Sequence, residues 1–528
     1  MVSSVDIEIL NKTLISIAEE MGIVLQRSAF SPNIKERRDF SCAIFDSSGQ
    51  LLAQAAHIPV HLGAMPDTVA VIRRDFDLEP GDIIITNDPF AGGTHLPDIT
   101  LISGVFSPRN ERLLFYLVSR AHHADVGAKV PGSMALVRHL EDEGVVIRPS
   151  FFSKNGQILD DYLHDLVSLM RNKRERAGDL RAQVASLLRG ETRLQDVLNR
   201  YGEERLFSQL PHLISYGKRF MENTIGRIPD GSYEFQDFLD DDGAGSGPIP
   251  IHTRIDICGD RAVVDFDGTA MQLSTGLNAT KSVTRSAVYY CFFCLVGEGY
   301  PVNSGSLAPV EVRIPIGCLL NPMPPAPVAA GNVETSQRVV DTVLGALSKA
   351  LPEVIPAASC GSMNNLSIGG VGRHGDEFTY YETIGGGMGA RPGKNGLSGV
   401  QVHMTNTLNT PIEALELAYP IMVEQYGIRR GSGGQGRYSG GDGIIRRYKF
   451  MSHCKFSLLT ERRRLAPWGL NGGQDGRMGK NLLMRDGSDR VEGLPGKCVI
   501  EAKPGDVLEI RTPGGGGWGF LNLDKTTN

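Results

Sequence analysis

The segment Asn87–Asp98, NDPFAGGTHLPD, is the stretch on which the predicted fold depends. It follows the apolar run at residues 83–85, which is typical of a buried strand. Pro89 and the pair Gly92 and Gly93 then break regular structure. The polar residues of the segment are therefore predicted to lie on a loop at a strand end, where catalytic and binding residues often lie.

A hairpin is predicted directly after this loop. Residues 99–106 and 113–118 have the composition of two strands, and the residues between them are typical of a turn. Strands of a hairpin run antiparallel, so residues at their outer ends lie opposite each other. This arrangement predicts that Asp98 lies opposite Ala121 or His122.

The second strand leads into the segment Ser119–Asp125, SRAHHAD. His95 lies three residues before Asp98 and can fold back to the same point as His122. Two imidazoles and one carboxylate can hold a divalent transition metal and leave coordination positions open. The alternative is that these are ordinary surface or core histidines, because an HxxD pattern is common.

Composition indicates a large globular protein and excludes several function classes. With 528 residues, 41% apolar and 22% charged, the chain is expected to form two to four domains. The net charge of −6 provides no basic surface for nucleic acid. No apolar run reaches the ~18 residues of a membrane span, and the first residues lack a signal region. A cytoplasmic protein without a membrane partner is therefore expected. Eight cysteines are too few for a disulfide scaffold.

The order of the expected elements predicts a mixed α and β (α+β) fold with several lobes. Helices are expected at residues 4–28, capped by Ser3 or Ser4, and at 65–75, 160–225, 282–296 and 335–351. The predicted domains are an N-terminal α/β lobe with the metal site at 1–155, a helical segment at 156–230, a central α/β lobe at 231–425 and a β-rich part at 426–528. The glycine run at 512–517 has two equally good explanations. Its backbone packs closely against another segment, such as a partner chain, or it forms a flexible terminal loop.

Several other polar residues are candidates for a site. Asp39, at a strand start, is either a further metal ligand or a solvated carboxylate. His57 and His61 lie four apart, but Pro59 between them disfavours a helix, so a structural or substrate-lining role is expected.

Later in the chain, Glu334 and Glu382 are candidate substrate contacts. The presence of Glu334 is explained equally well by a capping network at the start of the helix expected at 335–351, which Thr335 or Ser336 would cap. The acidic residues 141–143 are expected to form a solvated loop. No GxxxxGK[ST] pattern occurs, so a P-loop for ATP is not predicted.

Taken together, these segments resemble the hydantoinase B/oxoprolinase family over nearly the whole chain. The resemblance is carried by residues 34–42, 57–63, 87–98, 122–127, 331–336, 406–413 and 512–517. It implies the catalytic B subunit of an ATP-dependent cyclic-amide hydrolase of the N-methylhydantoinase, 5-oxoprolinase or lactamase type. Two alternatives stay open: the equivalent subunit of an acetone or acetophenone carboxylase acting on a ketone, and a scaffold without catalytic function.

The resemblance also implies partners and residue roles. A hydantoinase A-type subunit with an actin-like ATPase fold is expected to bind ATP in an α2β2-like hetero-oligomer. Zinc or manganese is expected on His95, Asp98 and a later histidine. That histidine is His122, with His123 as the alternative. The residues proposed as base, or as orienting a ligand histidine, are Asp39, Asp88 and Asp125, with His123 as a further catalytic candidate.

Overall fold

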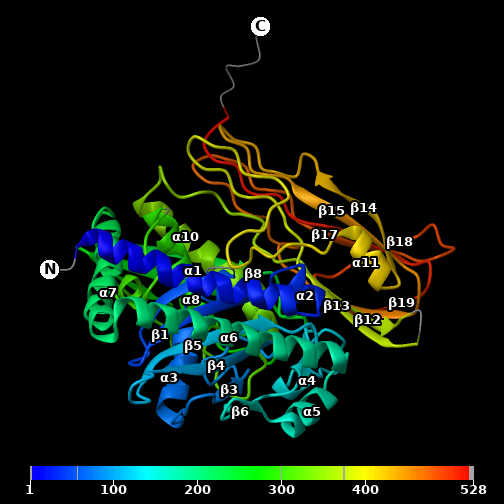
Figure 1. The fold of residues 1–528 in the computed structure, drawn as a ribbon. Helices are drawn as coiled ribbons and strands as arrows, with labels where there is room; N and C mark the ends of the chain where they lie inside the picture. The colour runs from blue at the N-terminus through cyan, green and yellow to red at the C-terminus, as the bar shows by residue number, and fades with distance from the viewer. Residues whose placement is uncertain (1–2, 56–57, 298, 373–374, 522–528) are drawn as a thin grey trace.

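The computed structural model describes residues 3–55, 58–297, 299–372 and 375–521. His57, one of the predicted substrate contacts, lies outside the described residues. Within them the chain is a mixed α and β protein whose strands form four sheets, which confirms the predicted class. In Figure 1 the C-terminal strands are grouped together, away from α3 and β3. None of the described helices combines the length and hydropathy that crossing a bilayer requires.

The first sheet contains most of the sequence motifs and has the strand order β2-β1-β5-β4-β3-β6-β7. Its strands are β1 (Phe40–Asp46), β2 (Leu51–Ala55), β3 (Ile83–Thr86), β4 (Asp98–Phe106), β5 (Leu113–His122), β6 (Ser150–Lys154) and β7 (Gln157–Ile158). Successive side chains of a strand point to opposite faces, and here both faces are buried. Cys42 and Ile44 of β1 pack in the core with α1 (Ser4–Ser28) and α6 (Lys173–Tyr201), while Ala43 and Phe45 pack with α3 (Met65–Asp75).

The helices of this region begin and end close to their predicted bounds. α1 spans Ser4–Ser28 and begins with a capping box, in which Ser3 and Asp6 satisfy each other's backbone N–H groups. The predicted helical region contains α5 (Asp160–Ser168), α6 and α7 (Glu203–Ile225). Shorter helices are α2 (Pro32–Lys35), η1 (Pro59–His61), α4 (Leu140–Glu143), α9 (Ser304–Leu307) and α11 (Ile412–Ala418).

The hairpin of β4 and β5 has the predicted register. Asp98 is paired with His122 across the two strands, and the pairing continues to Phe106 and Leu113, with one irregularity near the turn. On its other edge β5 pairs with β1, where Phe40 lies opposite Ala121. The start of β4, the end of β5 and the start of β1 therefore meet at one edge of the first sheet.

The second sheet has the order β11-β10-β9-β8 and packs against α8 (Lys281–Val296) and α10 (Ser336–Ala350). Its strands are β8 (Gly231–Leu239), β9 (Ile249–Cys258), β10 (Arg261–Asp265) and β11 (Val310–Arg313). A π-helical turn, η2 (Gly331–Thr335), leads into α10. Thr335 takes the N-cap position of α10, one of the two predicted, but its side chain makes no capping hydrogen bond. Its hydroxyl donates to the Leu277 carbonyl oxygen instead, and that of Ser336 donates to the Asn332 carbonyl oxygen.

The remaining strands form a third sheet, β13-β12-β16-β19, and a fourth, β14-β15-β20-β17-β18. Their bounds are β12 (Asn365–Val371), β13 (Glu377–Glu382), β14 (Ile421–Arg429), β15 (Gly443–Phe450), β16 (Cys454–Leu459), β17 (Lys480–Met484), β18 (Val491–Leu494), β19 (Lys497–Ala502) and β20 (Val507–Arg511). The third sheet takes strands from both sides of residue 425, where the sequence suggested a boundary.

The glycine-rich segments pack against one another within this chain. Gly515 N–H donates to the Gly441 carbonyl oxygen at 2.9 Å, and Gly441 N–H donates to that of Met388 at 2.8 Å. Figure 1 shows these segments as extended traces beyond the fourth sheet. A Cβ atom on Gly515 would lie 2.1 Å from the Met388 oxygen, so only glycine allows the backbones to approach this closely.

The acidic segment 141–143 differs from the solvated loop predicted for it. Glu143 is buried at the end of α4, and its carboxylate accepts hydrogen bonds from the N–H groups of Val328 at 3.1 Å and Ala329 at 2.9 Å. Burial raises the pKa of Glu143 to about 8, and these two hydrogen bonds only partly offset that effect. Glu143 therefore joins α4 to the backbone that leads into η2.

We expect Glu143 to make the protein less stable as the pH rises from about 5 to about 8, because over that range the folded chain holds a proton that the unfolded chain releases. A shift of this size corresponds to a few kcal/mol. Glu143→Gln should therefore flatten the plot of melting midpoint against pH, relative to the unmodified chain. Exposed Glu141→Gln, on the same helix, is the control and should leave the slope unchanged. Equal slopes for the two variants would contradict this role.

Candidate metal centre

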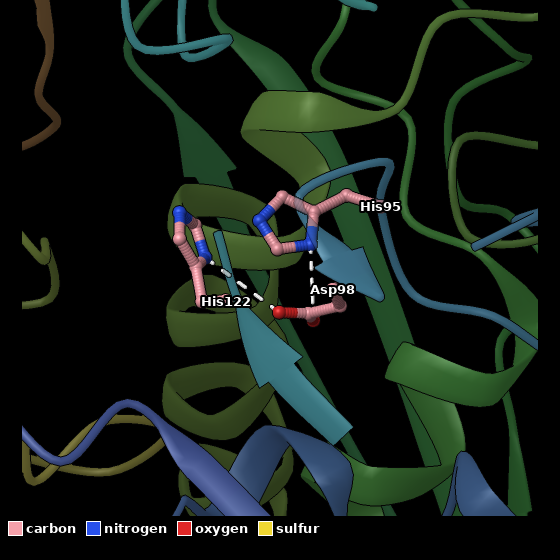
Figure 2. Close-up of side chains that lie close together, drawn as sticks. All are labelled: His95, Asp98 and His122. Atoms are coloured by element: carbon pink, nitrogen blue, oxygen red, sulfur yellow. Dashed lines mark ion pairs between the residues drawn. The ribbon is translucent and has the colours of Figure 1, made fainter. Parts of the chain in front are cut away.

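His95, Asp98 and His122 form a buried cluster at the edge of the first sheet. Each offers one ligand atom, and the three atoms lie within 4.8 Å of one another. Figure 2 shows both imidazole rings beside the carboxylate of Asp98. Nδ1 of His95 lies 3.0 Å from Oδ2 of Asp98, and Nδ1 of His122 lies 3.6 Å from its Oδ1. The predicted convergence of these side chains is therefore present.

The fold positions each of the three residues by a different local device. Asp98 begins β4 and His122 ends β5, so the antiparallel pairing places them opposite each other. His95 lies on the preceding loop, where its carbonyl oxygen accepts the Asp98 N–H at 3.1 Å. Asn87 holds the base of that loop, because its Nδ2 donates to the Leu96 carbonyl oxygen at 2.8 Å.

Glycine is required in this loop at position 92. Gly92 has a φ of +84°, in the left-handed region. A Cβ atom there would also lie 2.4 Å from the backbone nitrogen of Thr68, at the start of α3. The loop carrying His95 therefore packs directly on α3. The sequence had indicated Gly92 only as a break in regular structure.

Electrostatics favours a charged Asp98 and a neutral His122. Burial opposes ionisation of Asp98, but the neighbouring His95, His61 and His122 together hold its pKa well below the usual range. Burial lowers the pKa of His122. A carboxylate and a neutral imidazole are the forms that ligate metal ions.

The donor set suits a divalent transition metal. Each of the three residues has one buried atom without a hydrogen bond in the described part of the structure: Nδ1 of His95, Oδ1 of Asp98 and Nε2 of His122. Buried polar atoms are normally satisfied, so unsatisfied atoms on all three residues fit a bound metal ion. Two imidazoles and one carboxylate are typical of zinc, manganese or iron sites.

Two further predicted residues join this cluster. Nε2 of His61 lies 3.2 Å from Oδ2 of Asp98, and its Nδ1 lies 2.9 Å from the hydroxyl of Ser41. Asp39 lies at the rim, with Oδ2 4.0 Å from Nδ1 of His122 and its side chain 10% exposed. His61 therefore contacts the proposed ligand Asp98 directly, and Asp39 is the most exposed carboxylate at the centre.

His123 points away from the cluster. Its Nε2 lies 3.0 Å from Oε1 of Gln183 on α6, while its backbone N–H donates to the Pro97 carbonyl oxygen at 2.8 Å. Burial lowers the pKa of His123 to about 4. Adjacent residues of a strand end project to opposite sides, which separates His123 from His122.

Asp88 and Asp125 hold loops of the chain. Asp88 accepts the Phe90 N–H at 2.9 Å. Asp125 accepts hydrogen bonds from the N–H groups of Gly127 and Gly132, each at 2.9 Å, and pairs with Arg171 at 3.0 Å. Among the described side-chain hydrogen bonds, none joins Asp88 or Asp125 to His95, Asp98 or His122.

Glu334 and Glu382 occupy separate buried networks. Burial raises the pKa of Glu334 to about 7, and Oε1 of Glu334 accepts hydrogen bonds from Met363 N–H and Asn365 Nδ2. Glu382 pairs with Arg446 at 3.1 Å and accepts the hydroxyl of Tyr380 at 2.9 Å. Neither carboxylate contacts the metal cluster within the described residues.

Sequence reasoning missed three neighbours of the cluster. The hydroxyl of Thr94 donates to Oδ2 of Asp98, Nδ2 of Asn332 lies 3.4 Å from Nε2 of His95, and the ring of Tyr381 stacks on that of His122. Thr94 and Asn332 lie in segments already marked as motifs. Nothing in the local sequence indicates Tyr381, because it comes from β13 of a different sheet.

Comparison with known proteins matches residues 3–520 to the family Hydantoinase B/oxoprolinase. An uncharacterized protein of Methanocaldococcus jannaschii is 41% identical over 98% of this chain and 90% of its own length. 5-oxoprolinase 1 of Arabidopsis thaliana is 40% identical over 98% of this chain and 42% of its own length. The chain therefore spans about two fifths of the plant protein.

Two solved structures share the fold. The ATP-dependent caprolactamase from Pseudomonas jessenii has a TM-score of 0.92 at 26% identity, covering 98% of this chain and 92% of its own. Nucleotide-free acetone carboxylase has a TM-score of 0.89 at 19% identity, covering 97% of this chain and 75% of its own. At this lower identity the second likeness concerns the fold alone.

Proposed function

This chain belongs to the hydantoinase B/oxoprolinase family, and we propose that it is the catalytic B-type subunit of an ATP-dependent cyclic-amide hydrolase. The observation that carries the proposal is the buried cluster of His95, Asp98 and His122, with one orphaned polar atom on each residue. The names of the plant relative, a 5-oxoprolinase, and of the structural neighbour, a caprolactamase, support a cyclic amide as the substrate.

In this proposal His95, Asp98 and His122 hold one divalent cation, zinc or manganese. When bound, such an ion polarises a carbonyl oxygen or lowers the pKa of water. His61 holds the Asp98 carboxylate through its second oxygen, 3.2 Å away, and Ser41 orients that imidazole. Fixing a ligand through such an outer contact is usual at metal sites.

Asp39 is proposed as the general base. It lies beside His122, and its side chain is 10% exposed, compared with 1% for Asp98. A base must reach the proton that it removes, so a rim position suits attack by water on a carbonyl group. Four other carboxylates are proposed to have a structural role, in which they hold the loops and walls of the site without touching the substrate: Asp88, Asp125, Glu334 and Glu382. His123 is proposed to anchor its strand end to Gln183 on α6.

ATP is proposed to bind to an A-type partner subunit in a hetero-oligomer. The sequence contains no P-loop pattern. The alignment with the plant 5-oxoprolinase covers only 42% of that protein, so most of it has no counterpart in these 528 residues. The caprolactamase is described as ATP-dependent, which supports a nucleotide-driven reaction here too.

The test is to purify this chain with its A-type subunit and assay three cyclic amides: 5-oxoproline, N-methylhydantoin and caprolactam. We expect ring opening of one of them to require both chains, ATP and about one equivalent of metal per chain. Chelation should abolish turnover, and zinc or manganese should restore it. Full turnover by a metal-free complex would contradict the proposed centre and favour a scaffold role.

The alternative is the matching subunit of a ketone carboxylase, which the fold likeness to acetone carboxylase keeps open. The same complex should then consume acetone or acetophenone only when bicarbonate is present. Hydrolysis of a cyclic amide needs no bicarbonate. Bicarbonate-dependent loss of a ketone, without ring opening of any amide, would replace the leading proposal.

A further inference from the structure

Tyr381, on β13 of the third sheet, contacts a proposed metal ligand on the first sheet. Its ring lies nearly parallel to that of His122, with an angle of 8° and 4.8 Å between ring centres. Both residues are buried. Stacked rings of this kind have a defined relative orientation, so the position of one restricts the other.

The Tyr381 ring is itself fixed by a directed row of hydrogen bonds. Its hydroxyl donates to Oδ1 of Asn365 at 2.7 Å. Nδ2 of Asn365 donates to Oε1 of Glu334 at 2.7 Å and to the Leu459 carbonyl oxygen at 2.8 Å. Because both acceptors lie on the amide nitrogen side, the amide oxygen must face Tyr381, and the hydroxyl acts as the donor.

Arg37 holds Tyr381 as well. Its guanidinium lies over the Tyr381 ring, 4.8 Å from the ring centre, and its Nη1 donates to the Tyr381 carbonyl oxygen at 3.1 Å. Nη2 of the same guanidinium donates to the hydroxyl of Thr383 at 3.1 Å. Arg37 is fully buried, so these contacts use a cation that water does not reach.

The backbone of His122 is anchored separately from its ring. The His122 N–H donates to the Asp39 carbonyl oxygen at 2.9 Å, and Nδ2 of Asn33 donates to the His122 carbonyl oxygen at 2.7 Å. The ring has weaker restraints, because Nε2 has no hydrogen bond among the described residues and Nδ1 lies 3.6 Å from Asp98. In the described part of the chain, two rings contact that of His122: the ring of His95 is tilted by 52° with centres 4.9 Å apart, and only the ring of Tyr381 is nearly parallel to it.

We propose that Tyr381 is a positioning residue, which sets the plane of the His122 ring at the proposed metal centre. This inference rests on the proposed function, because it assumes that His122 is a ligand. A metal ligand must present its lone pair within a narrow range of directions, and outer contacts commonly supply that restraint. The third sheet thus completes a centre whose proposed ligands lie on the first sheet and on the loop that leads into β4.

The experiment uses Co²⁺ as the probe, because its visible absorption reports the geometry of its ligands. The full chain, Tyr381→Phe, Tyr381→Leu and the control Tyr380→Phe are titrated with Co²⁺, and affinity and spectrum are recorded. Tyr380 is the neighbouring buried tyrosine, and its hydroxyl bonds Glu382 instead of the Asn365 row. Each Phe variant therefore removes one buried hydroxyl, but only the Tyr381 hydroxyl bonds to Asn365 and so fixes the ring that stacks on His122.

We expect Tyr381→Leu to bind Co²⁺ about 10- to 100-fold more weakly, with a changed spectrum, as for other lost outer contacts. Tyr381→Phe keeps the stack and should show a smaller loss in the same direction, while Tyr380→Phe should match the unmodified chain. Equal effects of the two Phe variants would overturn the proposal, even if Tyr381→Leu failed to fold. If the unmodified chain binds no Co²⁺, the proposed function fails together with this inference. If it binds Co²⁺ and both Tyr381 variants match it, only this inference fails.

Discussion

His95→Ala should remove the bound metal and abolish product formation while the complex with the A-type subunit still assembles. The substitution deletes one of the three proposed ligands. It also removes the imidazole whose Nδ1 lies 3.0 Å from Oδ2 of Asp98. Loss of an outer contact alone costs about 10- to 100-fold in metal affinity, so loss of a ligand should cost more than about a hundredfold. Metal content by mass spectrometry, binding affinity and ring opening are the measurements.

The controls separate loss of the metal from loss of the fold. Asp98→Asn keeps the size of the side chain but removes the charge, and should also lose the metal. His212→Ala, at an exposed position on α7, removes an imidazole that is not part of the cluster and should behave as the unmodified chain. Normal metal content together with full turnover in His95→Ala would refute the assignment of this centre.

Gly515→Ala should destabilise the C-terminal half of the protein strongly. The added methyl group would lie 2.1 Å from the carbonyl oxygen and 2.3 Å from the carbonyl carbon of Met388, neither of which can rotate away. Overpacking a side-chain core costs about 1–3 kcal/mol, and a clash with backbone should reach or exceed the upper end of that range. The melting midpoint should fall, and limited proteolysis should cut the glycine-rich segments sooner.

The matched control is Gly493→Ala on β18, where a Cβ atom would meet no other atom within 4 Å. This variant changes the same residue type in the same part of the chain and should alter stability by no more than about 0.5 kcal/mol. Equal melting midpoints for the two variants would show that close backbone contact is not what requires glycine at position 515.

The local pattern of the sequence was sufficient to predict the bounds of elements such as α1 and the β4–β5 hairpin. α1 carries apolar residues at helical spacing and a capping pair at its first turn, so its bounds match those predicted. The β4–β5 hairpin has strands of similar length and a short turn, so counting placed Asp98 opposite Ala121 or His122, and the structure pairs it with His122. Thr335 takes the predicted N-cap position of α10 but makes no capping hydrogen bond, because its hydroxyl donates to the Leu277 carbonyl oxygen of a segment far away in the sequence.

The amino-acid sequence by itself determined the family, the mixed class of the fold and the proximity of His95 and Asp98 to one of the two histidines at 122 and 123. These depend on motifs and on strand register, which are local along the chain. Only the tertiary structure placed His122 in the cluster with His123 outside it, brought His61 to Asp98 and stacked Tyr381 on His122. These contacts join residues from separate elements, so they depend on how sheets and helices pack, and no spacing along one segment records that packing.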